Sequence, residues 1–291
     1  MPIAIAHPTE PTSGPLLIFG CGYVGLRVAQ QERQAGRTVY ALTRRRAELL
    51  AQQGILPLSG DVLAPESLPP FPAEATVLYA VGYDRFCGRS MREVYLHGLE
   101  HVLERLPAPR RFVYLSSTSV YGQSDGSWVD EDSPAEPSDE SGRVVRDAEL
   151  LLRQCLPHAI ILRSAGIYGP NRLLRRREQL LQHEPISGDP HRWLNLIHVD
   201  DLVAAIRLAM DRSPPAALYN VVDDIPVTRQ EFYTLLAELY GAPPPRFADL
   251  PEPRANHRRI RNSRLRHALH WQPRYPSIRE GLPAALAASE S

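Results

Sequence analysis

Lysine is absent from this chain of 291 residues, so all 33 of its basic residues are arginines. They balance 33 acidic residues, and the formal net charge is zero when histidine is counted as neutral. Without an excess of positive charge, the chain lacks the electrostatic attraction by which proteins bind nucleic acids and anionic membranes. We therefore expect neither nucleic acid nor membrane as a partner. The sequence is compatible with a homodimer.

Long apolar runs and cysteines are also scarce. No apolar run reaches the roughly 18 residues of a transmembrane helix, and residues 1–13 lack the basic and apolar regions of a signal peptide. The three cysteines, Cys21, Cys87 and Cys155, do not have the spacing of a metal site. An odd number of cysteines without metal spacing is typical of reduced thiols. We therefore expect a cytoplasmic protein with no metal site and with residues 1–13 as a flexible tail.

A glycine-rich turn follows the first expected strand. The apolar run Leu16–Phe19 leads directly into Gly20, Cys21, Gly22, Tyr23, Val24 and Gly25, a G-x-G-x-x-G pattern that opens an apolar helix face. Gly20 permits the tight turn, Gly22 lets the backbone approach a pyrophosphate, and Gly25 lets the helix pack closely on the strand. The helix N-terminus then directs unpaired N–H groups toward the phosphates. The pattern predicts that these six residues bind a dinucleotide.

The end of the second expected strand distinguishes between two dinucleotides. After residues 38–42, a protein that binds NAD would carry an acidic residue for the ribose 2′-hydroxyl. This chain has Thr43, Arg44, Arg45 and Arg46 there. A carboxylate would repel a 2′-phosphate, whereas a guanidinium would pair with it, at about 1.5–3 kcal/mol for each charge-assisted bond. Thr43, Arg44 and Arg45 therefore favour NADP as the cofactor, with NAD as the alternative.

Strand-like and helix-like segments alternate along the chain, which is typical of an α/β fold with a doubly wound parallel sheet. The expected strands are 16–19, 38–42, 55–58, 76–80, 111–115, 159–162 and 218–222. The expected helices after the glycine turn are 47–53, 90–106, 142–154, 171–182, 200–210, 230–240 and one from about 277. The polar stretch 122–140 is expected to be a loop, long enough to suggest a function at the carboxyl edge of the sheet.

Four segments together resemble the short-chain dehydrogenase/reductase superfamily, and within it the extended NAD(P)-dependent epimerase/dehydratase family. They are the glycine turn and the segments 113–122 (VYLSSTSVYG), 162–170 (LRSAGIYGP) and 197–202 (IHVDDL). The resemblance covers nearly the whole chain. It implies an NADP-binding Rossmann domain formed by residues 14–165 and 195–222. It also implies a smaller, interleaved C-terminal substrate domain formed by residues 166–194 and 223–291.

The resemblance also implies roles for particular residues. Asp61 and Val62 would flank the adenine of the cofactor. Further cofactor-binding residues at the cleft would be Ala80, Val81, Gly82 and Ser116. Ser117 matches the serine or threonine that hydrogen-bonds the reacting oxygen of the substrate, so we predict a catalytic role for it.

The catalytic motif of the family, Tyr-x-x-x-Lys, is missing. Its two positions align with Ser141 and Val145, and no other alignment can recover the lysine because the chain has none. An aliphatic hydroxyl is far less acidic than a phenol, whose pKa is about 10. Arg143 and Arg146 are close in sequence, but a guanidinium stays protonated and does not have the compact charge of an ammonium group. The chain therefore resembles an atypical member of the superfamily.

Another phenol is the candidate proton donor. Tyr121 follows the strand that bears Ser117, and Tyr83 follows the strand that ends at Ala80, so both are expected near the carboxyl ends of strands. We predict Tyr121 as the second catalytic residue, although a tyrosine at this position of the family also shapes the pocket. A basic run from Arg254 to Arg266 either binds a diphosphate or forms a solvated surface.

Two functions from different classes follow. The first is an NADP-dependent oxidoreductase, or an epimerase/dehydratase-like enzyme, that acts on a hydroxyl or carbonyl of a small substrate such as a nucleotide sugar. The second is a catalytically inactive, NADP-binding sensor or regulatory protein. The glycine turn supports both. The missing tyrosine and lysine favour the sensor, whereas Ser117, the long loop and the substrate domain favour the enzyme, which is our first hypothesis.

Overall fold

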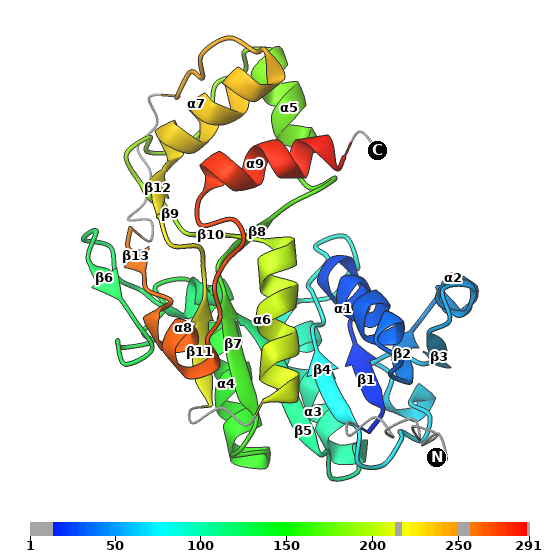
Figure 1. Ribbon diagram of the computed structural model, residues 1–291. Helices are drawn as coiled ribbons and strands as arrows, with labels where there is room; N and C mark the ends of the chain where they lie inside the picture. The colour runs from blue at the N-terminus through cyan, green and yellow to red at the C-terminus, as the bar shows by residue number, and fades with distance from the viewer. Residues whose placement is uncertain (1–13, 213–216, 249–256, 290–291) are drawn as a thin grey trace, which may run out of the picture. The chain divides into compact units, whose positions relative to one another are not determined.

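The computed structural model describes residues 14–212, 217–248 and 257–289 (Figure 1). The expected tail, residues 1–13, and Arg254 of the basic run lie outside the described residues. The chain divides into two compact units, which we call the N-terminal unit, residues 1–113, and the C-terminal unit, residues 114–291. The boundaries expected from the sequence are different ones, and they stay a prediction.

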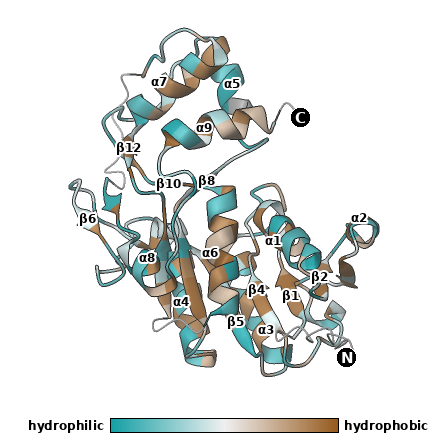
Figure 2. Ribbon diagram, viewed as in Figure 1, coloured by the Kyte–Doolittle hydropathy of each residue, from teal (hydrophilic) through white to brown (hydrophobic). Residues whose placement is uncertain are grey.

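The N-terminal unit is built on parallel strands. β1 (Leu16–Phe19) pairs with β2 (Val39–Thr43) on one side and with β4 (Thr76–Tyr79) on the other, and β2 pairs with β3 (Leu56–Ser59). Every residue of β1 and β4 is buried, and Figure 2 shows β1 in the colours of hydrophobic residues. Such apolar runs are typical of parallel strands that are covered on both faces.

Helices connect these strands. α1 (Tyr23–Gln34) joins β1 to β2, and α2 (Ala47–Gln52) joins β2 to β3. The helix expected over residues 90–106 is present as a π-helical turn, Glu93–His97, followed by α3 (Gly98–Arg105). After α3 the chain enters β5 (Arg111–Ser117), which begins in the N-terminal unit and ends in the C-terminal unit.

The C-terminal unit also contains parallel strands. β7 (Ile160–Ser164) lies next to β5 in the sheet order and pairs in parallel with β11 (Leu218–Val221). α4 (Glu140–Cys155) connects β5 to β7, and α6 (Val199–Asp211) precedes β11. Parallel strands connected through helices in both units confirm the expected α/β class.

A hydrophobic core of this unit involves α5 (Leu174–Leu181), α7 (Arg229–Tyr240) and α9 (Ile278–Ala287). Figure 1 shows these three helices close together. Two short strand pairs adjoin them: β8 (Gly166–Tyr168) with β10 (Leu196–His198), and β9 (Trp193–Leu194) with β12 (Val227–Thr228). The buried members of the core come from residues 166–194 and 223–291, the segments that the sequence assigns to a substrate domain.

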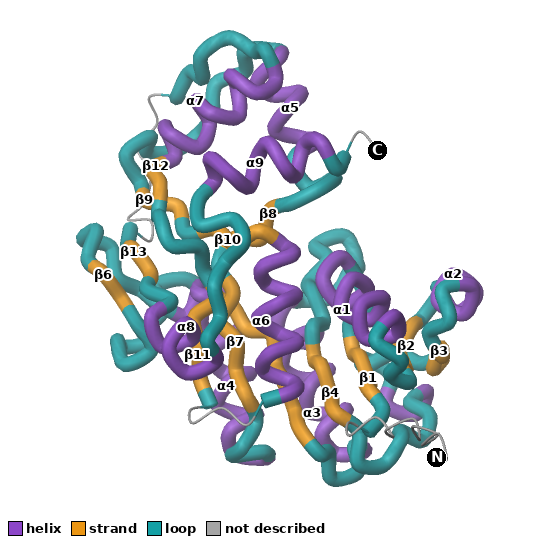
Figure 3. The backbone as a smooth tube through the Cα atoms, viewed as in Figure 1, coloured by secondary structure: helices purple, strands orange, loops and turns teal. Residues whose placement is uncertain are grey.

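The long polar segment 122–140 is more ordered than expected. It contains the short strand β6 (Trp128–Val129), which pairs in parallel with β13 (Arg259–Ile260) (Figure 3). α8 (Ser263–Leu269) follows β13 directly. Sequence patterns did not predict β6 or β13, because a two-residue strand has too few residues to show a periodicity.

Candidate functional site

The glycine turn has the geometry that its sequence predicts. Gly20 has a φ of 85°, and a Cβ atom there would lie 2.3 Å from the carbonyl oxygen of Ala80. A Cβ atom at Gly25 would lie 2.4 Å from the carbonyl oxygen of Gly20. Both contacts are far shorter than a van der Waals contact, so only glycine fits at these two positions. At Gly22, by contrast, a Cβ atom would meet no described atom within 4 Å.

The N-terminus of α1 has no competing side chain. Gly22 is the residue before its first turn, no side chain caps the helix there, and the first turn contains no acidic residue. The first N–H groups of an α-helix have no partner inside the helix, and they carry a partial positive charge that attracts anions. These residues therefore fit the pyrophosphate of a dinucleotide.

One of the side chains after β2 contacts the glycine turn. The Oγ1 atom of Thr43 accepts a hydrogen bond from the backbone N–H of Arg46 at 3.0 Å. The Nη2 atom of Arg46 donates to the carbonyl oxygen of Cys21 at 2.5 Å. Arg44 forms an ion pair with Asp61 at 3.7 Å, and its side chain is 59% exposed. Arg45 is exposed.

Arg46 is thus a residue that the sequence prediction missed. Three consecutive arginines signalled a basic site, but only the folded backbone shows which of them reaches the glycine turn.

The remaining predicted cofactor residues of the N-terminal unit have different surroundings. The backbone of Ala80 lies close to Gly20, and the N–H of Ala80 donates to the carbonyl oxygen of Phe19 at 2.8 Å. Asp61 accepts a hydrogen bond from the N–H of Leu63 at 3.0 Å. The Val62 carbonyl contacts the imidazole of His101 at 2.8 Å. Val81 is half-buried and Gly82 is exposed.

Cys21 is an inert member of the turn. Its side chain is buried, and burial raises the pKa of its thiol to about 11. A protonated, buried thiol is a poor nucleophile. The geometry therefore favours a packing role for this side chain.

Two consecutive serines end β5 in the C-terminal unit. Ser116 is buried, and its hydroxyl donates to Glu149 at 2.5 Å. The Oγ atom of Ser117 accepts a hydrogen bond from the N–H of Ser119 at 3.1 Å. The Ser117 hydroxyl proton has no acceptor among the described residues, so it can be donated to a substrate oxygen.

Tyr121 is fully buried. Its hydroxyl donates to Oδ1 of Asn220 at 2.9 Å, and the guanidinium of Arg163 lies 4.9 Å from the ring centroid. Burial raises the pKa of its hydroxyl, although the charge of Arg163 opposes that shift. A phenol that is already hydrogen-bonded inside the core is poorly placed to exchange protons with a substrate. The catalytic role of Tyr121 stays a prediction, and these contacts favour a structural role.

The charge on Arg163 is compensated by Glu149. The Nε and Nη2 atoms of Arg163 donate to the two carboxylate oxygens of Glu149 at 3.0 and 2.7 Å. Both side chains are buried. Burial lowers the pKa of Arg163, but the Glu149 carboxylate outweighs this effect and raises that pKa above its ordinary value.

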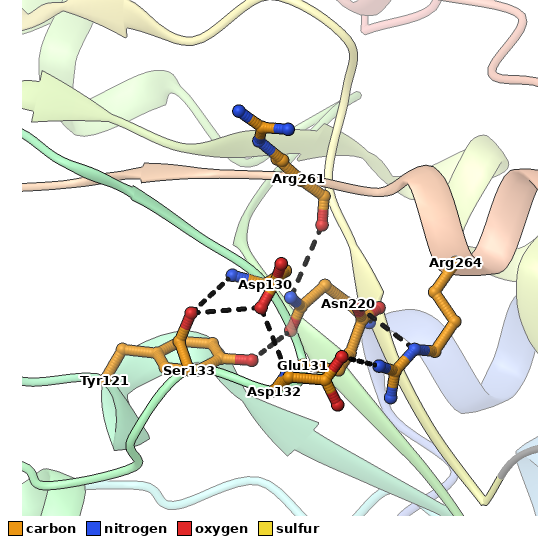
Figure 4. A network of polar contacts seen from close by, with 8 residues as sticks. All are labelled: Tyr121, Asp130, Glu131, Asp132, Ser133, Asn220, Arg261 and Arg264. Atoms are coloured by element: carbon orange, nitrogen blue, oxygen red, sulfur yellow. Dashed lines mark hydrogen bonds and ion pairs between the residues drawn. The ribbon is translucent and has the colours of Figure 1, made fainter.

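Asn220 connects Tyr121 to the loop that contains β6 (Figure 4). The backbone N–H of Asn220 donates to Glu131 at 2.7 Å. Glu131 lies 3.7 Å from the guanidinium of Arg264, which also pairs with Asp132 at 2.5 Å. The loop expected at the functional edge is therefore fixed to β11 and α8 by polar contacts.

The two positions of the missing catalytic motif lie in the first turns of α4. Ser141 is exposed, and Val145 is only 4% exposed and belongs to the core. Arg143 forms an ion pair with Glu140 at 3.1 Å, and Arg146 forms one with Asp147 at 3.4 Å. Both neighbouring cations are therefore engaged with carboxylates.

The basic run after residue 256 has several environments. Arg266 forms an ion pair with Asp224 at 2.9 Å. Arg259 and Arg261 stack over Trp128, with their guanidinium carbons 4.9 and 5.3 Å from the ring centroid. Arg258 is buried. The run is therefore not a uniform solvated surface.

No group of three or more His, Cys, Asp or Glu side chains is placed to hold a metal ion in residues 14–212, 217–248 and 257–289. Over the same residues, none of the helices combines the length and the apolar character needed to cross a membrane.

The parallel strands and the glycine turn define a Rossmann-like α/β protein. The chain belongs to the NAD dependent epimerase/dehydratase family, whose sequence model matches residues 16–221. This finding confirms the resemblance inferred from the four sequence segments.

Three similar proteins illustrate the relationship. Protein YeeZ of Escherichia coli (strain K12) is 31% identical over 187 residues, which cover 63% of this chain and 66% of YeeZ, just under two thirds of its length. The structure of a functionally unknown conserved protein from Silicibacter pomeroyi is 31% identical, with a TM-score of 0.79 over 96% of this chain and 100% of that chain. MoeE5, solved in complex with UDP-glucose and NAD, has a TM-score of 0.76 at 24% identity over 95% of this chain and 99% of that chain. The last comparison shows the fold alone.

Proposed function

We propose that this protein is an NADP-dependent oxidoreductase of the epimerase/dehydratase type, acting on a hydroxyl or carbonyl group of a small substrate. The observation that carries the proposal is the glycine turn, where Gly20 and Gly25 are sterically required and the N-terminus of α1 is uncapped. A bound nicotinamide dinucleotide would supply hydride transfer. The family and the NAD bound to MoeE5 support a dinucleotide.

The preference for NADP rests on the arginines after β2. No acidic residue lies between this strand and α2. The side chain of Arg44 is exposed, and its ion pair with Asp61 at 3.7 Å is weak. Arg44 can therefore exchange Asp61 for a 2′-phosphate. Arg46, bonded to the glycine turn, adds a second positive charge.

Ser117 is the proposed contact for the reacting oxygen. Its hydroxyl already accepts one hydrogen bond, which orients it, and it retains its proton for donation. UDP-glucose is bound by MoeE5, so a nucleotide sugar is one substrate class to test.

The cofactor proposal is tested by titrating the protein with NADPH and NADH and following nucleotide fluorescence. We expect NADPH to bind at least about tenfold more tightly, and Arg44→Glu to reduce that difference because it places a carboxylate near the 2′-phosphate. Arg105→Glu, the same charge change at the exposed end of α3, is the matched control. Equal affinities of the native protein for the two nucleotides would rule out the NADP preference.

An inactive NADP-binding sensor is the second candidate. The specific observation in its favour is Val145, a core residue at the position where the family carries its lysine. A screen of nucleotide sugars and small carbonyl compounds, with NADPH oxidation as the readout, separates the two functions. Tight NADPH binding without turnover of any compound would favour the sensor.

A further inference from the structure

Arg258 is a buried guanidinium with most of its donors unsatisfied. Only 6% of the surface of this residue is exposed. Its Nη2 atom donates to the carbonyl oxygen of Thr118 at 2.7 Å. Its Nε and Nη1 atoms are buried and have no hydrogen-bond partner among the described residues.

Burying a guanidinium with unpaired donors lowers the stability of the fold, which is unfavourable for a side chain with a purely structural role. An uncompensated buried charge destabilises a fold by several kcal/mol. Arg163, in the same unit and equally buried, has both oxygens of Glu149 as partners. Arg258 has one backbone carbonyl instead, so its remaining donors point to a ligand with oxygen acceptors.

The charges around Arg258 do not replace such a ligand. Burial lowers the pKa of Arg258 to about 10. Electrostatic interactions with Tyr121 and Asp139 oppose this shift, and the positive charge of Arg192 adds to it. Arg258 therefore remains a cation near pH 7. None of these three side chains hydrogen-bonds to the Nε or Nη1 atom of Arg258.

The position of Arg258 places this charge beside the proposed reaction centre. Thr118, its only hydrogen-bond acceptor among the described residues, directly follows Ser117. The N-terminus of α4 is also close, since a Cβ atom at Gly142 would lie 2.4 Å from the carbonyl oxygen of Ser119. A residue about 140 positions later in the chain thus contributes the buried cation that Arg143 and Arg146 do not supply.

We propose that Arg258 binds an anionic group of the substrate, a carboxylate or a phosphate, next to residues 117–119. This inference rests on the proposed function, because it takes Ser117 as the contact for the reacting oxygen. A guanidinium presents several N–H donors in one plane, which match two oxygens of a carboxylate or phosphate. The substrate class is then a small hydroxy or carbonyl compound that carries an oxyanion close to its reacting carbon.

The test measures the binding of inorganic phosphate and of malonate by isothermal titration. We expect the wild-type protein to bind at least one of them, and Arg258→Met to weaken that binding at least about tenfold through the loss of charge-assisted bonds. The melting temperature of Arg258→Met should be unchanged or higher, because the variant removes an uncompensated buried charge. Arg143→Met, which removes an exposed arginine paired with Glu140, is the matched control and should bind both anions as the wild type does.

Arg258→Gln provides a second variant that keeps a donor for the Thr118 carbonyl without the charge. It should show the same loss of anion binding as Arg258→Met. The proposal is overturned if the wild type binds neither anion, if either variant binds as the wild type does, or if both variants melt at clearly lower temperature. Tighter binding of malonate than of phosphate identifies a carboxylate as the preferred group, and the reverse identifies a phosphate.

A further variant separates this inference from the proposed function. Gly22→Val should abolish NADPH binding, yet the phosphate binding that depends on Arg258 should remain. If the native protein binds phosphate through Arg258 but does not bind NADPH, the cofactor proposal fails while the anion site stands.

Discussion

Replacing Tyr121 by phenylalanine distinguishes a catalytic tyrosine from a structural one. The substitution removes only the hydroxyl, which donates to Asn220 at 2.9 Å inside the core. The ring and its stacking under Arg163 at 4.9 Å would remain. Oδ1 of Asn220 would then lack its donor from Tyr121, and leaving a buried acceptor unsatisfied costs about 1–3 kcal/mol.

The expected result is therefore a loss of stability. For a protein of this size each kcal/mol corresponds to roughly 2–4 °C, so Tyr121→Phe should lower the melting temperature by several degrees. Urea denaturation gives the free energy of unfolding, and steady-state turnover on an identified substrate gives kcat. We expect kcat per folded molecule to change by less than about tenfold, because a buried, hydrogen-bonded phenol is not placed for proton transfer.

The opposite pattern would refute this reasoning. A fall in kcat of about two to four orders of magnitude with unchanged stability would assign Tyr121 to general acid–base catalysis. Tyr83→Phe is the control, since the hydroxyl of Tyr83 donates to the Arg89 carbonyl in an exposed position. That variant should change the free energy of unfolding by no more than about 0.5 kcal/mol.

Three further predictions concern buried charges and the glycine turn. Glu149→Gln should lower the free energy of unfolding, measured by urea denaturation, by about 3–5 kcal/mol, because it leaves the buried Arg163 uncompensated. Glu140→Gln, at an exposed ion pair, is the control and should change the free energy of unfolding by at most about 0.5 kcal/mol. Equal effects of the two substitutions would contradict the role of Glu149 in compensating the buried charge. Burial raises the pKa of Asp223 well above its ordinary value, so the folded state binds its proton more tightly than the unfolded state, and stability is lost as pH rises above the unfolded pKa of about 3.8. Asp223→Asn should therefore gain melting temperature relative to the wild type as the pH rises above about 3.8, and a difference in melting temperature that does not depend on pH would exclude this titration. Gly22→Val should fold normally but lose NADPH binding, whereas Gly25→Val should lose both its stability and NADPH binding, because only the Cβ atom at position 25 would collide with the backbone, at 2.4 Å. NADPH titration and thermal melting of the two variants test this prediction. Normal NADPH binding by Gly22→Val would exclude the dinucleotide site.

Local sequence patterns were sufficient for the fold class and for the glycine turn. The apolar strand, the spacing of Gly20, Gly22 and Gly25 and the following helix are all determined by residues within one short segment. The conformations and close contacts at Gly20 and Gly25 follow from the absence of a Cβ atom, a property of the residue itself. The absence of lysine likewise excluded the family's Tyr-x-x-x-Lys motif without any structure.

Only the tertiary structure decided the environments of the charged and phenolic side chains. Arg44, Arg45 and Arg46 are alike in sequence, yet Arg46 is the one bonded to the glycine turn. Tyr121 was expected at a functional edge, but it is buried and its hydroxyl donates to Asn220, 99 positions later in the chain.

The buried cation beside Thr118 is Arg258, 140 positions later in the chain, within a basic run that the sequence could equally place on the surface. Burial, hydrogen bonding and charge compensation depend on neighbours that are distant in sequence, and a pattern of residue types does not record which distant neighbours meet.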